Sequence, residues 1–182
     1  SAASDVYKRQ AMGGQQIVPD IPGIDRENVF GIEDILLGRR VIEGRKVAVI
    51  GGGHVGLEVA HFLCANNKVT IVEMADEIGA SVYYITKFKL LPLLREAGVT
   101  FRTGQAIAAV DDGSIRLRDT HTGQCTELKA EAVVLAMGSR PDLAARAAFD
   151  RNFDHVVYAG DAVRGGTMLE ANRDAFALAW EF

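Results

Sequence analysis

The sequence predicts an α/β fold in which a parallel sheet carries an inserted antiparallel β-meander. A buried strand, a glycine-rich turn, a helix and a second buried strand follow one another within residues 46–73, which is the order of a parallel βαβ unit. Five short strand patterns separated by turn residues follow between residues 99 and 136, as expected for a meander added to such a unit. A last strand and helix within residues 156–180 complete the pattern.

Residues 1–40 precede the βαβ unit and show little regular pattern. Residues 1–10 have no apolar period, and we interpret them as a non-native leader, which would make the chain a fragment of a longer protein. Residues 11–40 are punctuated by glycine and proline and predict an irregular connection. Within it we expect a short helix at residues 32–37 and a core contact from residues 28–30.

The βαβ unit has the clearest pattern in the chain. Residues 47–50 are apolar and rich in β-branched side chains, as in a strand that is buried on both faces. The turn that follows reads Gly51-Gly52-Gly53-His54-Val55-Gly56. A helix is predicted from Val55 to about residue 65, and Asn66-Asn67 is expected to end it, since Asn tolerates the left-handed conformation that glycine usually adopts. Residues 69–73 predict the second strand.

The rest of the chain alternates between helical and strand patterns. Residues 81–97 predict a helix that is kinked at Pro92 or begins just before it. Turns at residues 112–113 and 122–123 separate three of the strands that follow. The five strands are expected at residues 99–103, 106–110, 115–118, 125–128 and 132–136. A strand at residues 156–159 and a helix at residues 167–180 end the chain.

The composition excludes several classes of function. Of the 182 residues, 48% are hydrophobic and 24% charged. The net charge of −4 argues against sequence-independent binding to nucleic acid, which needs a basic surface. No apolar run is long enough to span a bilayer and no signal peptide is evident, so we expect no membrane partner and a cytoplasmic location. Cys64 and Cys125 have no zinc or redox spacing. No Ser-His-Asp, Cys-His or metal-ligand pattern occurs, so neither a catalytic side chain nor a metal is predicted.

The glycine turn has the chemistry of a dinucleotide site. A pyrophosphate needs close backbone donors, and the first turn of a helix offers unpaired N–H groups and the positive end of the helix dipole. Gly51 permits the tight turn, Gly53 lets the backbone approach the phosphates, and Gly56 lets the helix pack close to the strand. The alternative is a glycine-rich turn without a ligand, but its position between a buried strand and a helix favours a Rossmann-like site.

Glu73 lies 22 positions after Gly51, at the end of the second strand. A carboxylate there can accept hydrogen bonds from ribose hydroxyls and would repel the additional phosphate of NADPH. Residues 74–77 supply no Arg or Lys, so NADH is favoured over NADPH. Two readings of Glu58 remain open, because it could face the nicotinamide or only complement the helix dipole. His54 is interpreted as a loop residue that lines the site rather than as a general base.

These motifs together resemble those of a known family. Residues 46–74 (KVAVIGGGHVGLEVAHFLCANNKVTIVEM) are similar to the NADH domain of flavoproteins with two dinucleotide-binding domains. The closest resemblance is to the C-terminal module of NADH:flavin oxidoreductases of the old yellow enzyme and 2,4-dienoyl-CoA (enoate) reductase type. Residues 133–141 (VVLAMGSRP) resemble the strand that returns to the flavin domain, and residues 158–162 (YAGDA) resemble a motif whose Asp contacts the flavin.

The resemblance implies a set of cofactor-binding residues. For NADH they are Gly51, Gly52, Gly53, His54, Val55, Gly56, Glu58, Glu73 and Met74. Met137 and Gly138 would form one crossover between domains and Gly13 the other, while Gly160 and Asp161 would contact FAD. The chain departs from the family at three positions, because Met12 and Met137 stand where Thr is usual and Asn67 stands where Gly is usual.

The expected function is that of the NADH-binding portion of an FAD-dependent oxidoreductase, with NAD(H) and FAD as cofactors. The expected domains are a flavin-domain remnant and connection (residues 11–40), an NADH-binding domain (41–142) and a return segment of the flavin domain (143–182). The partners implied are the upstream flavin domain of the same protein and a small-molecule acceptor. Because the family places its FAD-binding glycine motif upstream, we expect this chain alone to hold FAD poorly and to be inactive.

Two alternatives to this function remain open. The chain could be part of a pyridine nucleotide-disulfide reductase or NADH oxidase, whose active cysteines lie upstream in most branches of that group. It could also be a Rossmann module that binds nucleotide without an activity of its own.

Overall fold

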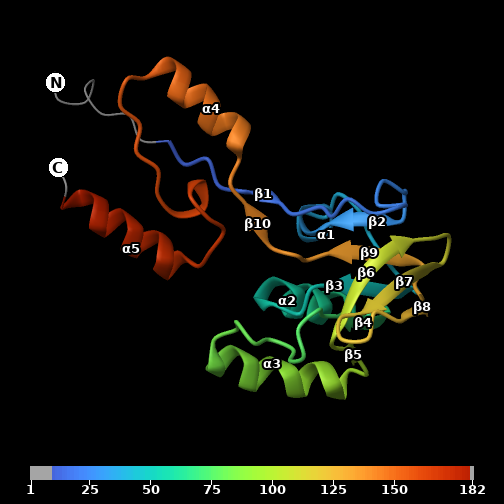
Figure 1. Cartoon of the computed structure of the whole chain (residues 1–182). Helices are drawn as coiled ribbons and strands as arrows, with labels where there is room; N and C mark the ends of the chain where they lie inside the picture. The colour runs from blue at the N-terminus through green and yellow to red at the C-terminus, as the bar shows by residue number, and fades with distance from the viewer. Residues whose placement is uncertain (1–9, 181–182) are drawn as a thin grey trace. The chain divides into compact units, whose positions relative to one another are not determined.

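The computed structural model describes residues 10–180 and divides them into two compact units (Figure 1). One unit comprises residues 18–138, and the other combines residues 10–17 with residues 139–180. The domain boundaries at residues 41 and 142 suggested by the sequence remain predictions.

The unit of residues 18–138 is built on a five-stranded parallel sheet, which confirms the predicted α/β class. The order of its strands is β2-β9-β3-β4-β5. Their bounds are Val29–Gly31 (β2), Lys46–Ile50 (β3), Lys68–Val72 (β4), Thr100–Arg102 (β5) and Ala132–Leu135 (β9). Three helices belong to this unit, namely α1 (Ile32–Leu36), α2 (His54–Leu63) and α3 (Tyr84–Glu96).

The inserted meander is also confirmed. Strands β6 (Gln105–Val110), β7 (Ser114–Asp119) and β8 (Cys125–Lys129) form a separate antiparallel sheet. Gly113 and Gly123 have the positive φ values, 78° and 73°, that the two predicted turns require. The first and last of the five expected strands, β5 and β9, belong to the parallel sheet instead.

Alternate residues of the central strands enter two hydrophobic cores, one on each face of the sheet. In β3, Val47 and Val49 pack with α2 and α3, while Ala48 and Ile50 pack with the meander. The helices and the meander accordingly cover opposite faces of the sheet (Figure 1). Burial on both faces explains why β3, β4 and β9 are continuous apolar runs rather than alternating ones.

Two glycines of the turn between β3 and α2 lie directly against neighbouring backbone. Gly51 has φ 110°, and a Cβ there would overlap the carbonyl of Ala136. A Cβ at Gly56 would overlap the carbonyl oxygen of Gly51, so α2 touches the end of β3 only because Gly56 has no side chain. Gly53 differs, because its φ is −74° and a Cβ would meet nothing within 4 Å.

Two local expectations for this unit are wrong. Residues 11–40 are not merely an irregular connection, because β2 pairs with β9 at the sheet edge. Neither Asn66 nor Asn67 adopts a left-handed conformation, since no non-glycine residue among those described has positive φ. The Asn67 side chain ends α2 instead, because its amide donates to the carbonyls of Leu63 (3.0 Å) and Ile42 (2.8 Å). An Asn side chain thus satisfies the end of the helix in place of a left-handed residue.

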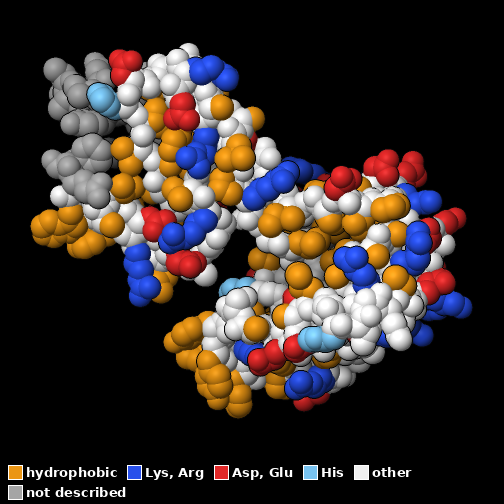
Figure 2. Space-filling model, viewed as in Figure 1, with side chains coloured by type: hydrophobic (Ala, Val, Ile, Leu, Met, Phe, Trp, Pro, Cys, Tyr) orange, Lys and Arg blue, Asp and Glu red, His pale blue; other side chains and the backbone are white. Residues whose placement is uncertain are grey.

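Helix α3 is continuous through Pro92, so it does not begin at the proline. Leu94 is fully buried, whereas Phe88 is 68% and Tyr84 73% exposed. Exposed hydrophobic side chains gather over this helix (Figure 2). The helical spacing of Phe88, Leu91 and Leu94 therefore predicts the helix correctly but does not indicate which face of the helix packs against the core.

The second unit combines the segments that precede and follow the first unit in the sequence. Strand β1 (Gln15–Gln16) pairs antiparallel with β10 (Ser139–Arg140). Helix α4 (Leu143–Asn152), which the sequence analysis did not predict, begins at an Asp142 cap, and α5 (Met168–Ala179) begins at a Thr167–Glu170 capping box. The predicted strand at residues 156–159 is not formed, because the described residues place no pairing strand beside it, and the chain continues into a short 3₁₀ turn, η2 (Gly160–Ala162).

Within residues 10–180, no helix combines the length and the apolar character needed to cross a bilayer.

The crowding at Gly56 predicts a stability difference between two glycines of the same turn. Gly56→Ala should lower the free energy of unfolding by about 1–3 kcal/mol, because the added methyl group overlaps the Gly51 carbonyl. This loss would occur although alanine is the better helix former. Gly53→Ala, the matched control, should cost less than about 1 kcal/mol, the cost of a poorer N-cap residue. Urea unfolding of both variants measures the difference, and equal stabilities would contradict the packing described.

Candidate functional site

The carboxyl ends of the parallel strands bring the glycine turn and Glu73 together. Strand β3 runs into the turn at Gly51, and β4, its neighbour, ends one residue before Glu73. Ligands of open α/β sheets bind at this edge, outside the carboxyl ends of the strands. The edge beside the turn is therefore the candidate site in this unit.

The N-terminus of α2 points out of the glycine turn and is open to a ligand. Gly53 is the N-cap residue, and no side chain caps this end of the helix. The first backbone bond of the helix runs from the Leu57 N–H to the Gly53 carbonyl, which leaves the preceding N–H groups for an outside acceptor. Uncapped donors beside the open space at Gly53 fit the pyrophosphate of a dinucleotide.

The Glu73 carboxylate lies over the glycine turn. Its Oε2 accepts a hydrogen bond from the Gly52 N–H at 2.6 Å, and its Oε1 accepts one from the Ala75 N–H at 2.8 Å. A carboxylate has about four lone-pair sites, so both oxygens keep capacity for ribose hydroxyls. The position therefore fits the adenosine ribose of a dinucleotide.

Gly52 has a structural role that the sequence motif does not reveal. A Cβ at Gly52 would lie 2.9 Å from Ile78 Cδ1 and 3.3 Å from Glu73 Oε2. The absence of a side chain at Gly52 therefore lets the Glu73 carboxylate approach the turn.

One expectation about the start of α2 needs correction. His54 is the first residue of the helix rather than a loop residue, and Glu58 lies in the second turn. His54 Nε2 lies 3.3 Å from Glu58 Oε1, with more than half of each side chain exposed. A contact with His54 along one face of the helix is thus a third role open to Glu58, besides facing the nicotinamide and complementing the helix dipole.

Met137 and Gly138 follow β9 on the other side of the turn. The backbone nitrogen of Met137 lies 3.4 Å from the position that a Cβ of Gly51 would occupy. The Met137 side chain packs on the core beneath the meander, and Gly138 has φ 88°. Met74, exposed at 63%, follows Glu73 at the same edge. The structure thus brings Met137 and Met74 to the edge that holds Gly51 and Glu73.

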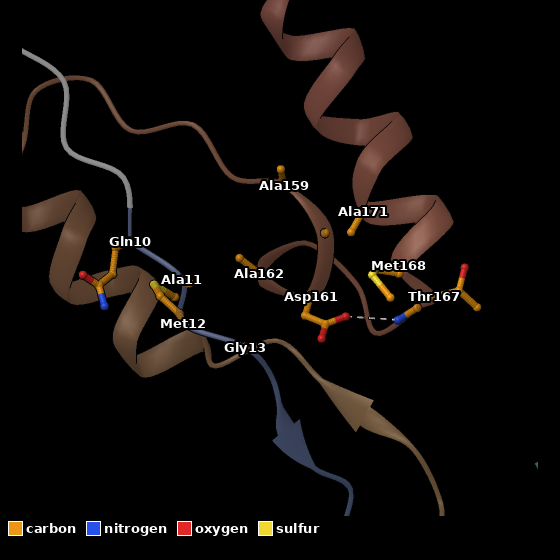
Figure 3. Close-up of a pocket in the computed structure, with 12 residues that line it drawn as sticks. Gln10, Ala11, Met12, Gly13, Ala159, Asp161, Ala162, Thr167, Met168 and Ala171 are labelled. Carbon is orange, nitrogen blue, oxygen red and sulfur yellow. Dashed lines mark hydrogen bonds between the residues drawn. The ribbon is translucent and has the colours of Figure 1, made fainter. Parts of the chain in front are cut away.

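The second unit has a pocket of its own. It has a volume of about 340 Å³ and lies between residues 10–13, the η2 turn and the start of α5 (Figure 3). Gly13, Gly160 and Asp161 therefore meet in one pocket, although they are far apart in the sequence. Asp161 Oδ1 accepts a hydrogen bond from the Gly166 N–H at 3.3 Å. A part-buried carboxylate with remaining lone pairs fits the hydroxyl-bearing part of a flavin nucleotide.

Sequence reasoning missed an ion pair beside Glu73. His121 Nε2 lies 2.6 Å from Asp76 Oδ1, although the two residues are 45 positions apart. Neither residue has a spacing in the sequence that suggests a partner. The sequence does predict the turn that carries His121, but not the surface against which that turn packs.

Comparison with known proteins assigns the family. Residues 10–156 match the family model described as pyridine nucleotide-disulphide oxidoreductase. The chain belongs to this family. Its members are oxidoreductases that use NAD(H) and FAD, and the Rossmann-like FAD/NAD(P)-binding fold predicted from the glycine turn is confirmed.

Three relatives illustrate the range of this family. The chain is 32% identical over 187 residues to an NADH oxidase of Thermoanaerobacter brockii, with 100% of this chain and 28% of that protein covered. It is 31% identical over 152 residues to a bilirubin reductase of Mediterraneibacter gnavus, covering 83% and 23% of the two. Among solved structures, a 2-naphthoyl-CoA reductase superposes with a TM-score of 0.79 at 26% identity, covering 94% and 26%. The chain thus spans 23–28% of the length of these relatives.

Proposed function

We propose that this chain is the NADH-binding portion of an FAD-dependent oxidoreductase. The observation that carries the proposal is the Glu73 carboxylate held over the Gly52 N–H, next to the uncapped N-terminus of α2. Acceptors for a ribose and donors for a pyrophosphate then lie side by side, in the arrangement that a dinucleotide requires. When bound, the nicotinamide supplies a hydride and the flavin accepts it.

The residues of the site would bind and orient rather than exchange protons. The N–H groups that follow Gly53 would hold the phosphates, and Glu73 would hold the adenosine ribose. Gly51 and Gly56 keep α2 against the end of β3 and so fix the direction of those donors. His54, Val55, Glu58, Met74, Met137 and Gly138 would line the remainder of the cofactor site. No side chain is required as acid or base for hydride transfer.

The pocket of the second unit supports flavin binding as part of the same proposal. Gly13 and Gly160, with φ 63° and 57°, shape two of its walls, and Asp161 supplies an acceptor. We propose that these residues contact FAD in the complete protein, together with a flavin domain of the same polypeptide.

The printed activities of the relatives bear on the electron acceptor. The relatives named above comprise an NADH oxidase, a bilirubin reductase and a 2-naphthoyl-CoA reductase. Because the region they share with this chain is 23–28% of their length while their named activities differ, we propose that it serves the common NADH side of the reaction. The match to the 2-naphthoyl-CoA reductase supports the narrower resemblance to the old yellow enzyme and enoate reductase type.

Gly53→Val tests whether the turn binds the cofactor. A Cβ at this position would meet no protein atom within 4 Å, so the variant should fold, but the valine side chain would occupy the space for the phosphates. NADH affinity, measured by calorimetry, should fall by tenfold or more. His61→Val, at an exposed position of the same helix, is the matched control and should bind like the wild type. Unchanged affinity in Gly53→Val would show that the turn is not the site.

The choice between NADH and NADPH tests the role of Glu73. The wild-type chain should bind NADH at least tenfold more tightly than NADPH, because the carboxylate repels a 2′-phosphate. Glu73→Gln should narrow that ratio by weakening NADH binding and relieving the repulsion. Glu77→Gln, which removes an exposed acid from the same loop, should leave the ratio unchanged. Equal affinities in the wild type, or an unaltered ratio in Glu73→Gln, would refute the assignment.

A further inference from the structure

The loop that carries Glu73 is bonded to the end of β5. The Glu73 N–H donates to the Arg102 carbonyl at 2.8 Å, and the Gln105 N–H donates to the Glu73 carbonyl at 3.0 Å. Two residues further along this loop, the Ala75 carbonyl accepts a hydrogen bond from the Gly104 N–H at 2.9 Å. Since the Ala75 N–H also holds Glu73 Oε1, the position of Ala75 is coupled directly to that of the carboxylate.

The end of β7 and the turn that follows it, residues 119–122, pack against the same loop. The Thr120 N–H and Oγ1 both donate to the Gly104 carbonyl, at 2.8 Å and 3.1 Å. Asp119 Oδ1 accepts from the N–H groups of Thr122 (2.7 Å) and His121 (3.0 Å). These bonds, those of Thr122 foremost, lower the pKa of Asp119, so the carboxylate that shapes the turn stays ionised.

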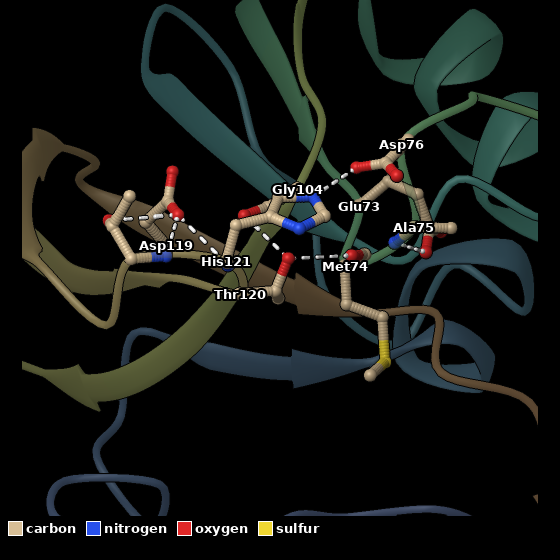
Figure 4. Close-up of polar contacts among 9 residues, drawn as sticks. Glu73, Met74, Ala75, Asp76, Gly104, Asp119, Thr120 and His121 are labelled. Carbon is tan, nitrogen blue, oxygen red and sulfur yellow. Dashed lines mark hydrogen bonds and ion pairs between the residues drawn. The ribbon is translucent and has the colours of Figure 1, made fainter.

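His121 reaches from this turn to Asp76 (Figure 4). Its Nε2 lies 2.6 Å from Asp76 Oδ1. The Asp76 carboxylate raises the pKa of His121 above the ordinary value of 6.5, with a smaller contribution from Asp119. Asp76 on the facing loop and Asp119 on its own turn are the charged groups that act on the imidazole. Both favour the protonated ring, so the contact is an ion pair at pH values below the raised pKa of His121.

We infer that the ion pair between His121 and Asp76 is a latch that positions the Glu73 loop and thereby sets the affinity for NADH. The inference rests on the proposed function, because it assigns His121 an effect on the cofactor through Glu73. His121 itself is a positioning residue. The path runs from His121 to Asp76, through the adjoining Ala75, to the Glu73 carboxylate.

The latch predicts a particular direction of pH dependence. Well below pH 6.5, His121 is protonated whether or not it is paired with Asp76. Pairing with Asp76 keeps it protonated to a higher pH. The ion pair is therefore fully present below the ordinary imidazole pKa and is lost as the pH rises through the raised pKa. The affinity of the full chain for NADH should fall over that alkaline range, whereas His121→Gln, whose amide can reach Asp76 without a charge, should show a flat profile.

A double-mutant cycle at about pH 6.5 separates a latch from direct attraction of the cofactor. His121→Ala, Asp76→Ala and the double variant should each weaken NADH binding by a similar factor of about two to five, the scale of an exposed ion pair. Direct attraction by a protonated His121 would instead leave Asp76→Ala with wild-type affinity or better. His61→Ala, at an exposed position on α2, is the control and should have no effect.

The amide signal of Ala75, followed by NMR without cofactor, keeps the latch distinguishable from the proposed function. In the wild type this signal should shift with the titration of His121, and in His121→Gln it should not. Any one of three results would refute the latch in a chain that binds NADH: additive effects in the double-mutant cycle, a flat pH profile of the wild-type affinity, or an Ala75 signal that does not follow His121. The proposed function would then stand. If the signal follows His121 but the chain does not bind NADH, the proposed function is wrong and the effect assigned to the latch is wrong with it.

Discussion

The close approach of α2 to the end of β3 is the constraint on which the site depends. The helix touches the carbonyl of Gly51 at the one position, Gly56, where no side chain intervenes. Because of this contact, the helix begins at the carboxyl edge of the sheet, with Gly53 as an N-cap residue to which no side chain is bonded. A helix displaced by the width of a methyl group would direct its first N–H groups elsewhere.

Glu73, which directly follows β4, supplies the negative charge of the site, and its position does not depend on a ligand. Both oxygens of Glu73 are already bonded to backbone N–H groups, one from Gly52 and one from Ala75. A cofactor would therefore meet an acceptor that is oriented in advance, which reduces the entropy lost on binding. A separate bond, from the Gly104 N–H to the Ala75 carbonyl, joins this loop to the segment that leads into the meander, and through the proposed latch an insertion outside the parallel sheet would influence cofactor binding.

Much of the fold was predictable because burial on both faces leaves a strong pattern in the sequence. β3, α2, β4 and the meander were all expected close to their observed bounds. β2 was not, because it has three residues and owes its place to Val133 and its neighbours, which lie far along the chain. α4 buries no residue, so it has no apolar stripe that would reveal its period. Residues 156–159 illustrate the converse, since an apolar run forms a strand only where another strand pairs with it.

The candidate site shows the same division. Gly51, Gly53, Gly56 and Glu73 could be named from their spacing alone, because a βαβ unit fixes where each must lie. The role of Gly52 depends on how near Glu73 and Ile78 come to it, and that distance is a property of packing. The pairing of His121 with Asp76 depends on how the meander turn lies against the loop after β4, and no spacing in the sequence reports it.

The most direct test of the central claim is a titration of the isotopically labelled chain with NADH, followed through its backbone amide signals. The account predicts that the largest changes occur at the amides of residues 52–56 and at Ala75, where the donors to phosphate and to Glu73 lie. Changes centred on Gly13, Gly160 and Asp161, with the amides of the glycine turn unmoved, would contradict it, as would the absence of any change.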